Sequence, residues 1–119
     1  MMDDSIDLES VDGYDLRAEM YDDEDSSPFE ADCYSPEDIS QWRNDDWKYV
    51  VIVVTASRQG IDLGSDSICS MECGRSGDRY INPLRDDTGD EFAYGYGPGL
   101  ITGAVADAKA ALAAINAAD

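Results

Sequence analysis

The residues Trp47–Ala56 place the strongest constraint on the fold. This stretch is rich in β-branched and aromatic side chains, and apolar residues occupy both sets of alternating positions. Successive side chains of a strand point to opposite sides, so this pattern is typical of a central strand that is covered on both faces. The connection Ser57–Gly60 ends in glycine and predicts a hairpin. We therefore expect an antiparallel sheet built around this strand.

The residues Ile61–Cys73 alternate in character and predict the second strand of the hairpin. Gly64 in this strand suggests a β-bulge, and Arg79–Asn82 predicts a third strand that ends at Pro83. One set of alternating positions is expected to face the core: Ile61, Leu63, Ser65, Ser67, Cys69, Met71 and Cys73. The other set is expected to face solvent: Asp62, Gly64, Asp66, Ile68, Ser70 and Glu72.

Two segments predict helices. Ser35, Pro36 and Asp38 have the spacing of an N-cap, a first-turn proline and a capping-box acid, which predicts a helix to about Asn44. A longer, alanine-rich helix is expected after Pro98-Gly99 and should pack on the sheet. Its apolar residues recur at the spacing of one helix face: Ile101, Val105, Ala108, Leu112 and Ile115.

The N-terminal third is more acidic and less regular. Residues 1–21 have loosely helical apolar spacing interrupted by Gly13, which predicts no more than a short helix. Residues 22–34 combine adjacent acids with Pro28 and predict an extended linker. The expected fold is α+β: a small antiparallel sheet packed by a C-terminal helix. It comprises a partly flexible acidic segment at 1–34 and an α+β domain at 35–119.

Charge is distributed unevenly along the chain. The 119 residues carry 27 acids and 8 bases and no histidine, a net charge of -19. Residues 1–47 hold -15 of it and residues 48–119 hold -4. Repulsion excludes direct binding to nucleic acid phosphates and disfavours an anionic membrane. Asp outnumbers Glu by 20 to 7 and there are two lysines, which would fit salt adaptation of the whole surface. The segregation favours an acidic element that meets a basic partner.

The residue types also limit the chemistry. The missing histidine excludes Ser-His-Asp and Cys-His catalysis and the usual metal ligand. Asp86–Glu91 is the segment nearest to a calcium loop, but its glycine is fourth and no glutamate follows at position twelve. Cys33, Cys69 and Cys73 supply too few ligands for zinc. The chain is therefore predicted to be non-enzymatic, with no metal and no cofactor.

Two further features bear on the compartment and on aromatic contacts. Residues 1–7 contain neither a basic region nor an apolar stretch, which predicts no secretory signal and a cytoplasmic location with free thiols. Tyr94 and Tyr96 lie in a glycine-rich segment and could anchor a partner, although packing against the last helix is the simpler interpretation. Trp42 and Trp47 are expected in the core.

The acidic surface offers a specific way to bind a basic protein. Duplex DNA presents one negative charge per roughly 1.7 Å of axis. Asp62 and Asp66 are expected on one exposed strand face, roughly 13 Å apart. Such an array would compete with nucleic acid for a Lys/Arg-lined groove. The residues expected to contact the partner are Asp22, Asp23, Glu24, Asp25, Asp45, Asp46, Asp62, Asp66 and Glu72.

Two resemblances point to a phage origin. The segment Trp47–Ser65 resembles a stretch found in small uncharacterised bacteriophage and prophage proteins. The size and charge are similar to those of phage-encoded inhibitors of host defence, namely anti-restriction proteins and DNA-mimicking anti-CRISPR proteins. The resemblance implies an inhibitor of a host nucleic-acid-binding complex, with a CRISPR effector as the leading target. The alternatives are a phage adaptor or assembly protein that binds through an aromatic surface, and an inhibitor that blocks a conformational change without mimicking DNA.

Overall fold

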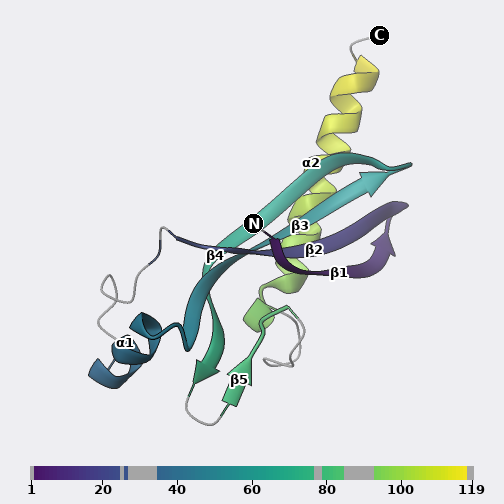
Figure 1. Ribbon diagram of the computed structural model, residues 1–119. Coiled ribbons are helices and arrows are strands. Elements are labelled where there is room, and N and C mark those ends of the chain that lie inside the picture. The colour runs from purple at the N-terminus through teal and green to yellow at the C-terminus, as the bar shows by residue number, and fades with distance from the viewer. Residues whose placement is uncertain (1, 25, 27–34, 77–78, 85–92, 118–119) are drawn as a thin grey trace.

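The computed structural model describes residues 2–24, 26, 35–76, 79–84 and 93–117 (Figure 1). Within them one antiparallel sheet has its strands in chain order: β1 (Met2–Val11), β2 (Tyr14–Asp22), β3 (Trp47–Arg58), β4 (Ile61–Ser76) and β5 (Arg79–Ile81). The helix α1 (Pro36–Arg43) precedes β3, and a 3₁₀ turn, η2 (Ala93–Gly95), leads into α2 (Gly97–Ala117). Figure 1 shows α2 running across one face of the sheet and extending past it. The expected α+β fold is confirmed.

The strand β3 lies in the middle of the sheet, as its sequence predicts. It pairs with β2 on one side and β4 on the other. The hairpin to β4 closes through Gln59 and Gly60, whose φ angles are 54° and 78°. Positive φ at both central residues is the type I′ geometry that matches the twist of two joined strands. The predicted hairpin is therefore confirmed.

The N-terminal residues form two strands, and the prediction of a short helix there was wrong. Four alternate residues of β2 are buried in the core: Tyr14, Leu16, Ala18 and Met20. Asp12 and Gly13, with φ of 53° and 83°, form the turn that joins β1 to β2. Because β2 pairs along its length with β3, residues 2–22 share the sheet and core of the predicted 35–119 domain. The predicted boundary at residue 34 therefore does not separate them from that domain.

The core lies between the sheet and α2. Val50, Ile52, Val54 and Ala56 of β3 point toward the helix, together with the buried residues of β2. From α2 the buried side chains are Leu100, Ala104, Val105 and Ala108. The predicted apolar stripe is confirmed at Val105 and Ala108, whereas Ile115 is 55% exposed because the helix continues beyond the sheet.

The helix packs directly on the backbone of β4 at Gly64. A Cβ atom at this position would lie 2.3 Å from the Ala108 nitrogen and 2.6 Å from the Ala104 oxygen. Real Cβ atoms do not approach backbone so closely, so only glycine permits this separation of helix and strand. Gly103 of α2 is equally close to Asp66, whose Oδ2 would lie 2.1 Å from an added Cβ. Gly64 therefore sets the distance between α2 and β4, and Gly103 leaves room for the Asp66 side chain.

The predicted faces of β4 are reversed over its first half. Gly64, Asp66 and Ile68 pair with Ala56, Val54 and Ile52 and so point toward α2. The strand pairing shifts on both sides of this stretch, beside Gly64 and again between Ile68 and Met71. Each shift inserts a residue and changes which side chains face the core. Ser65, Ser67 and Cys69 are therefore exposed, whereas Cys73, after the second shift, is buried as predicted.

The helix α2 is long and largely exposed. Among the described residues it is the helix whose length and composition would suffice to cross a membrane, with a mean hydropathy of 1.3 over its most apolar window and 22% of that window buried. The molecule is elongated, with extents of 58 × 25 × 23 Å.

We predict that Gly64→Ala lowers the free energy of unfolding by about 1–3 kcal/mol, because the added methyl group would force the helix backbone away from β4. Gly99→Ala is the matched control, since nothing lies within 4 Å of its position. It should change the free energy of unfolding by less than about 1 kcal/mol. Urea unfolding followed by circular dichroism measures both. Equal stabilities of the two variants would contradict the close packing described here.

Candidate functional site

Six of the predicted contact residues lie together at the end of the sheet beside α1, which we call the acidic end: Asp22, Asp23, Glu24, Asp45, Asp46 and Glu72. The Asp23 amide donates to the Tyr49 carbonyl, and Tyr49 pairs with Glu72 on the next strand. The Asp46 carbonyl accepts from the Arg75 amide at 2.7 Å. Neighbouring strands lie about 4.8 Å apart, so the backbone positions of Asp22 and Glu72 lie within roughly 10 Å of one another. Asp22 pairs with Val50 and Glu72 with Tyr49, so their side chains project from opposite faces of the sheet at this end. Asp25 falls outside the described residues.

The helix α1 fixes two of these acids. Its start is the predicted one, because Ser35 and Asp38 form a complete capping box and Pro36 opens the first turn. At its other end the Asp45 amide donates to the Trp42 carbonyl and the Asp46 amide to the Gln41 carbonyl. These two bonds are those of a Schellman motif, which turns the chain sharply at the end of a helix. Both carboxylates are consequently exposed at the start of β3.

Two acids of this end are bound to the protein itself. Asp22 Oδ1 lies 2.5 Å from Lys48 Nζ. Asp23 Oδ2 accepts from the Ser70 amide at 2.9 Å and from Ser26 Oγ at 2.8 Å. Ser70 has a φ of 59° in the irregular part of β4, so this carboxylate holds a strained turn of the strand. Asp22 and Asp23 therefore have structural partners in addition to their predicted role.

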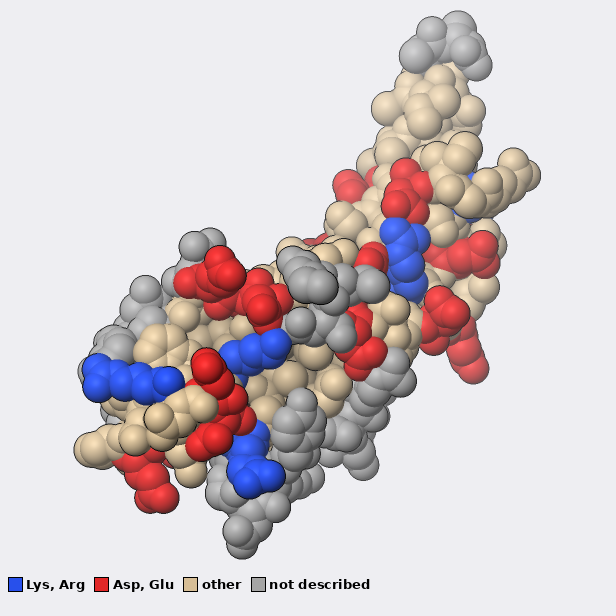
Figure 2. Space-filling model, viewed as in Figure 1, with Lys and Arg blue, Asp and Glu red and all other residues tan. Residues whose placement is uncertain are grey.

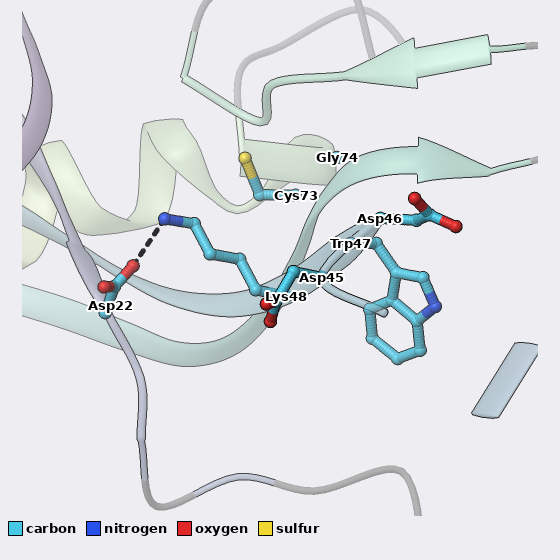
Figure 3. A pocket seen from close by; sticks show the side chains of 7 residues that line it. All are labelled: Asp22, Asp45, Asp46, Trp47, Lys48, Cys73 and Gly74. Atoms are coloured by element: carbon cyan, nitrogen blue, oxygen red, sulfur yellow. Dashed lines mark hydrogen bonds and ion pairs between the residues drawn. The ribbon is translucent and has the colours of Figure 1, made fainter. Parts of the chain in front are cut away.

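A pocket of about 360 Å³ opens at the acidic end. Its described lining comprises Asp22, Asp45, Asp46, Trp47, Lys48, Cys73 and Gly74. Figure 3 shows Lys48 extending toward Asp22 on the side of Cys73, while the Trp47 indole points away from them. The indole is buried, and its Nε1 donates to the Asp38 carbonyl at 2.9 Å, as expected for a core residue. The lining therefore has three carboxylates and one ammonium group.

Asp62 and Asp66 do not form the predicted array. Asp62 pairs with Ser57, and Asp66 pairs with Val54, whose side chains lie on opposite faces of β3. Asp66 packs against Gly103 of α2, so it lies on the core side of the sheet and not on the solvent side where it was expected. The prediction of two acids on one exposed face was wrong, because the shift in strand pairing near Gly64 separates them. Both also lie far along β4 from Glu72.

A network on the face opposite α2 engages Asp62. Arg17 donates to both carboxylate oxygens of Asp62, at 3.0 and 2.8 Å, and its Nε donates to Glu19 at 2.9 Å. Tyr21 Oη completes the network by donating to Glu19 at 2.8 Å. Arg17 lies on β2 and Asp62 on β4, so their ion pair spans the intervening strand β3. Thr55 of β3, which pairs with Arg17, is buried. Arg17 was not among the residues predicted to be functional; its position opposite the buried alternate residues of β2 is the signal that identifies it.

This network perturbs the acids in it. The hydrogen bonds from Tyr21 and then Arg17 hold the pKa of Glu19 below its ordinary value of 4.5. The hydrogen bond from Arg17 lowers the pKa of Asp62 below 3.8, and the hydrogen bond to Glu19 raises the pKa of Tyr21. Figure 2 shows acidic side chains at several places along the molecule, with basic ones between them. The negative charge is therefore partly compensated on the visible face.

The remaining candidate residues are the cysteines, the acidic turn and the tyrosines before α2. Cys69 is exposed and Cys73 is buried, so the two thiols predicted to share a face do not. Among the described side chains no group of three or more potential metal ligands occurs. The acidic turn Asp86–Glu91 lies outside the described residues, and so does Cys33. Tyr96 is 56% exposed just before α2 and is available for contact.

We predict that Arg17→Gln reduces the loss of stability on acidification. Glu19 and Asp62 have lowered pKa values in the folded state, so they contribute stability above their ordinary pKa values. That contribution disappears as the pH falls through the folded values, below about pH 4. Melting temperatures between pH 7 and pH 3 should therefore fall more steeply for the parent chain than for Arg17→Gln. Arg75→Gln, which removes the same charge from an exposed site, should follow the parent curve.

Comparisons with protein family models, with curated proteins and with solved structures found no match to this chain. The similarity of Trp47–Ser65 to small phage proteins thus stays a prediction from the sequence. The geometry and charge of the chain itself therefore indicate its function. Within that geometry the acidic end is the surface that gathers most of the predicted contact residues.

Proposed function

We propose that this protein is a phage-encoded, non-enzymatic inhibitor that binds a basic nucleic-acid-binding groove of a host defence complex. The acidic end occupies the groove in place of the phosphates, and a CRISPR effector complex in the host cytoplasm is the first target to test. The inhibitor acts by steric exclusion and charge complementarity, so the proposal requires neither a metal nor a cofactor.

The observation that carries the proposal is the grouping of exposed carboxylates at the acidic end. Glu24, Asp45, Asp46 and Glu72 are all exposed and come from three separate parts of the chain. Glu24 follows β2, Asp45 and Asp46 join α1 to β3, and Glu72 lies in β4, so these acids meet at one end of the sheet. A basic groove built for phosphates meets charges of the same sign at this end of the molecule.

The placement of Asp45 also supports a role in binding. It has a φ of 63° at the position after the α1 cap, where glycine is the favoured residue. Asp45 and Asp46 further place two negative charges at the negative end of the helix dipole. Both features oppose stability, and residues that break local rules in this way cluster at functional sites. Partner binding supplies a reason for acids at these two positions.

The test compares two variants with the same net charge. The first changes the acidic end: Glu24→Gln, Asp45→Asn, Asp46→Asn and Glu72→Gln. The second removes four exposed acids from elsewhere: Asp7→Asn, Glu9→Gln, Asp15→Asn and Glu37→Gln. The immobilised proteins are used to capture partners from a bacterial lysate, which mass spectrometry identifies. The first variant should bind the captured partner at least about tenfold more weakly than the second, because charge position and not total charge determines the fit.

The mechanism adds two requirements to this experiment. Duplex DNA or RNA should displace the parent protein from its partner, and affinity should fall about tenfold or more as salt rises from low to moderate concentration. Equal affinity of the two charge variants would contradict the acidic end as the contact surface. A ternary complex with nucleic acid still bound would contradict mimicry and favour the inhibitor that blocks a conformational change.

A second candidate function is supported by the exposure of Tyr96. Tyr96 is 56% exposed beside Gly95 and Gly97, in the segment for which packing against the last helix was the simpler expectation and partner contact the alternative. A phage adaptor or assembly protein would use such an aromatic contact, which is insensitive to salt. Tyr96→Ala should leave the affinity of an acidic inhibitor within about twofold of the parent. A large loss in this variant, with no loss in the acidic-end variant, would favour the adaptor.

A further inference from the structure

The outer edge of β4 has no neighbouring strand over most of its length in the described structure. The strand runs from Ile61 to Ser76, but β5 pairs only with Gly74–Ser76. Ser65, Ser67 and Cys69 are exposed along the open part. Natural proteins commonly protect such an edge with lysine or proline, and residues 61–73 contain neither. The edge therefore presents main-chain groups that can pair with an added strand.

The outward amides of this edge are held by carboxylates. The Ser65 amide donates to Asp107 Oδ2 of α2 at 3.1 Å, and the Ser67 amide donates to Asp66 Oδ1 at 2.9 Å. Pairing is regular between Gly64 and Ile68, so alternate amides in this stretch point to the same side. An added strand would use the Ser65 and Ser67 amides, which now donate to carboxylates. Carbonyl oxygens of that strand could replace these carboxylates without breaking any hydrogen bond between β3 and β4.

A pocket of about 340 Å³ lies at this same edge. Its described lining includes three successive edge residues, Leu63, Gly64 and Ser65, and carries the carboxylates of Asp62 and Asp107. Asp62 is already paired with Arg17, whereas Asp107 accepts from the Ser65 amide. The side chains of an added strand alternate between the two faces, so one of them would enter this pocket. A lysine or arginine is the side chain that this lining favours, because it would bind Asp107 and share Asp62 with Arg17.

We propose that the edge of β4 around Ser65 and Ser67, which we call the β4 edge, binds an extended basic segment of a partner protein as an additional strand. Carbonyl oxygens of the segment take over the two amides, and a basic side chain binds between Asp62 and Asp107. A second copy of this chain is a poorer occupant, because each copy carries a net charge of -19. Bulges on both sides limit the docking site to a short stretch.

This inference goes beyond the proposed function, since it concerns a different surface and main-chain recognition. Ser65 and Glu72 are seven positions apart on β4, which is roughly 23 Å in an extended strand. The acidic-end variant therefore leaves the β4 edge intact. Loss of binding at the acidic end can therefore be measured separately from loss of binding at the β4 edge.

The test uses an acetylated and amidated peptide of alternating lysine and threonine, about eight residues long, which matches a typical strand. A second peptide of the same sequence is N-methylated at alternate residues. N-methylation keeps the charge but removes the amides that pair with a strand edge. At low salt, the unmodified peptide should bind at least about tenfold more tightly than the N-methylated one, and it should slow hydrogen exchange at the Ser65 and Ser67 amides.

Two variants of the full chain sharpen the result. Asp107→Asn keeps an oxygen acceptor for the Ser65 amide but removes the charge, and should weaken binding about threefold or more. Glu37→Gln removes an exposed acid from α1 and should leave binding unchanged. The acidic-end variant should likewise retain most of its affinity for the peptide.

Three outcomes would overturn the proposal. They are equal affinity for the two peptides, protection from exchange elsewhere than the β4 edge, and no binding at about 1 mM peptide. Equal affinity would show that charge alone attracts the peptide. Because the comparison of peptides uses the unmodified protein, it stands even if a variant fails to fold.

Discussion

The contact of α2 with the backbone of β4 determines where the rest of the molecule lies. Gly64 permits the helix to approach the strand, and Gly103 makes room for Asp66 on the facing side. This contact buries the apolar face of β2 and β3 under the first half of the helix. It also positions Asp107 beside the β4 edge. The acidic end, by contrast, lies at the end of the sheet beside α1, where its charged groups remain in water.

Scarce cations connect the elements of this acidic chain. Arg17 links β2 to β4, Lys48 links β3 to the end of β2, and Lys109 links α2 to the turn at Asp12. Arg58 donates to the carbonyls of Asp12 and Gly13 and lies 4.2 Å from the centre of the Tyr14 ring. Each of these bases bonds a residue distant in sequence. The positive charges thus offset repulsion where strands and helix meet.

Patterns that depend on neighbours in the sequence could be predicted. The cap of α1, the central strand β3 and the last helix follow from residue type and spacing. The β1–β2 hairpin carried an equally local signal that was misread. Apolar residues alternate from Tyr14 to Met20, and Asp12-Gly13 is a favoured hairpin turn. The dense acids between them obscured this alternation.

Patterns that depend on pairing between strands could not be predicted. Two irregularities in β4 reverse its faces and separate Asp62 from Asp66. Gly64 predicted a bulge, which the shift beside it confirms, but its effect on the two faces and the second shift near Ser70 had no signal in the sequence. The grouping of Glu72 with Asp22 and Asp46 likewise requires the register of three strands. The sequence therefore indicated which residue types matter at the surface, while tertiary pairing decided which of them meet.

The far end of α2 has one more consequence. Beyond Leu112 the helix is exposed, and most of its residues there are alanine. Alanine has the highest intrinsic helix propensity, so these turns persist with little help from packing. They are nevertheless the part of the helix that opens most readily, because few buried contacts resist fraying. A fluorophore or affinity handle attached there would report on the molecule without disturbing its sheet.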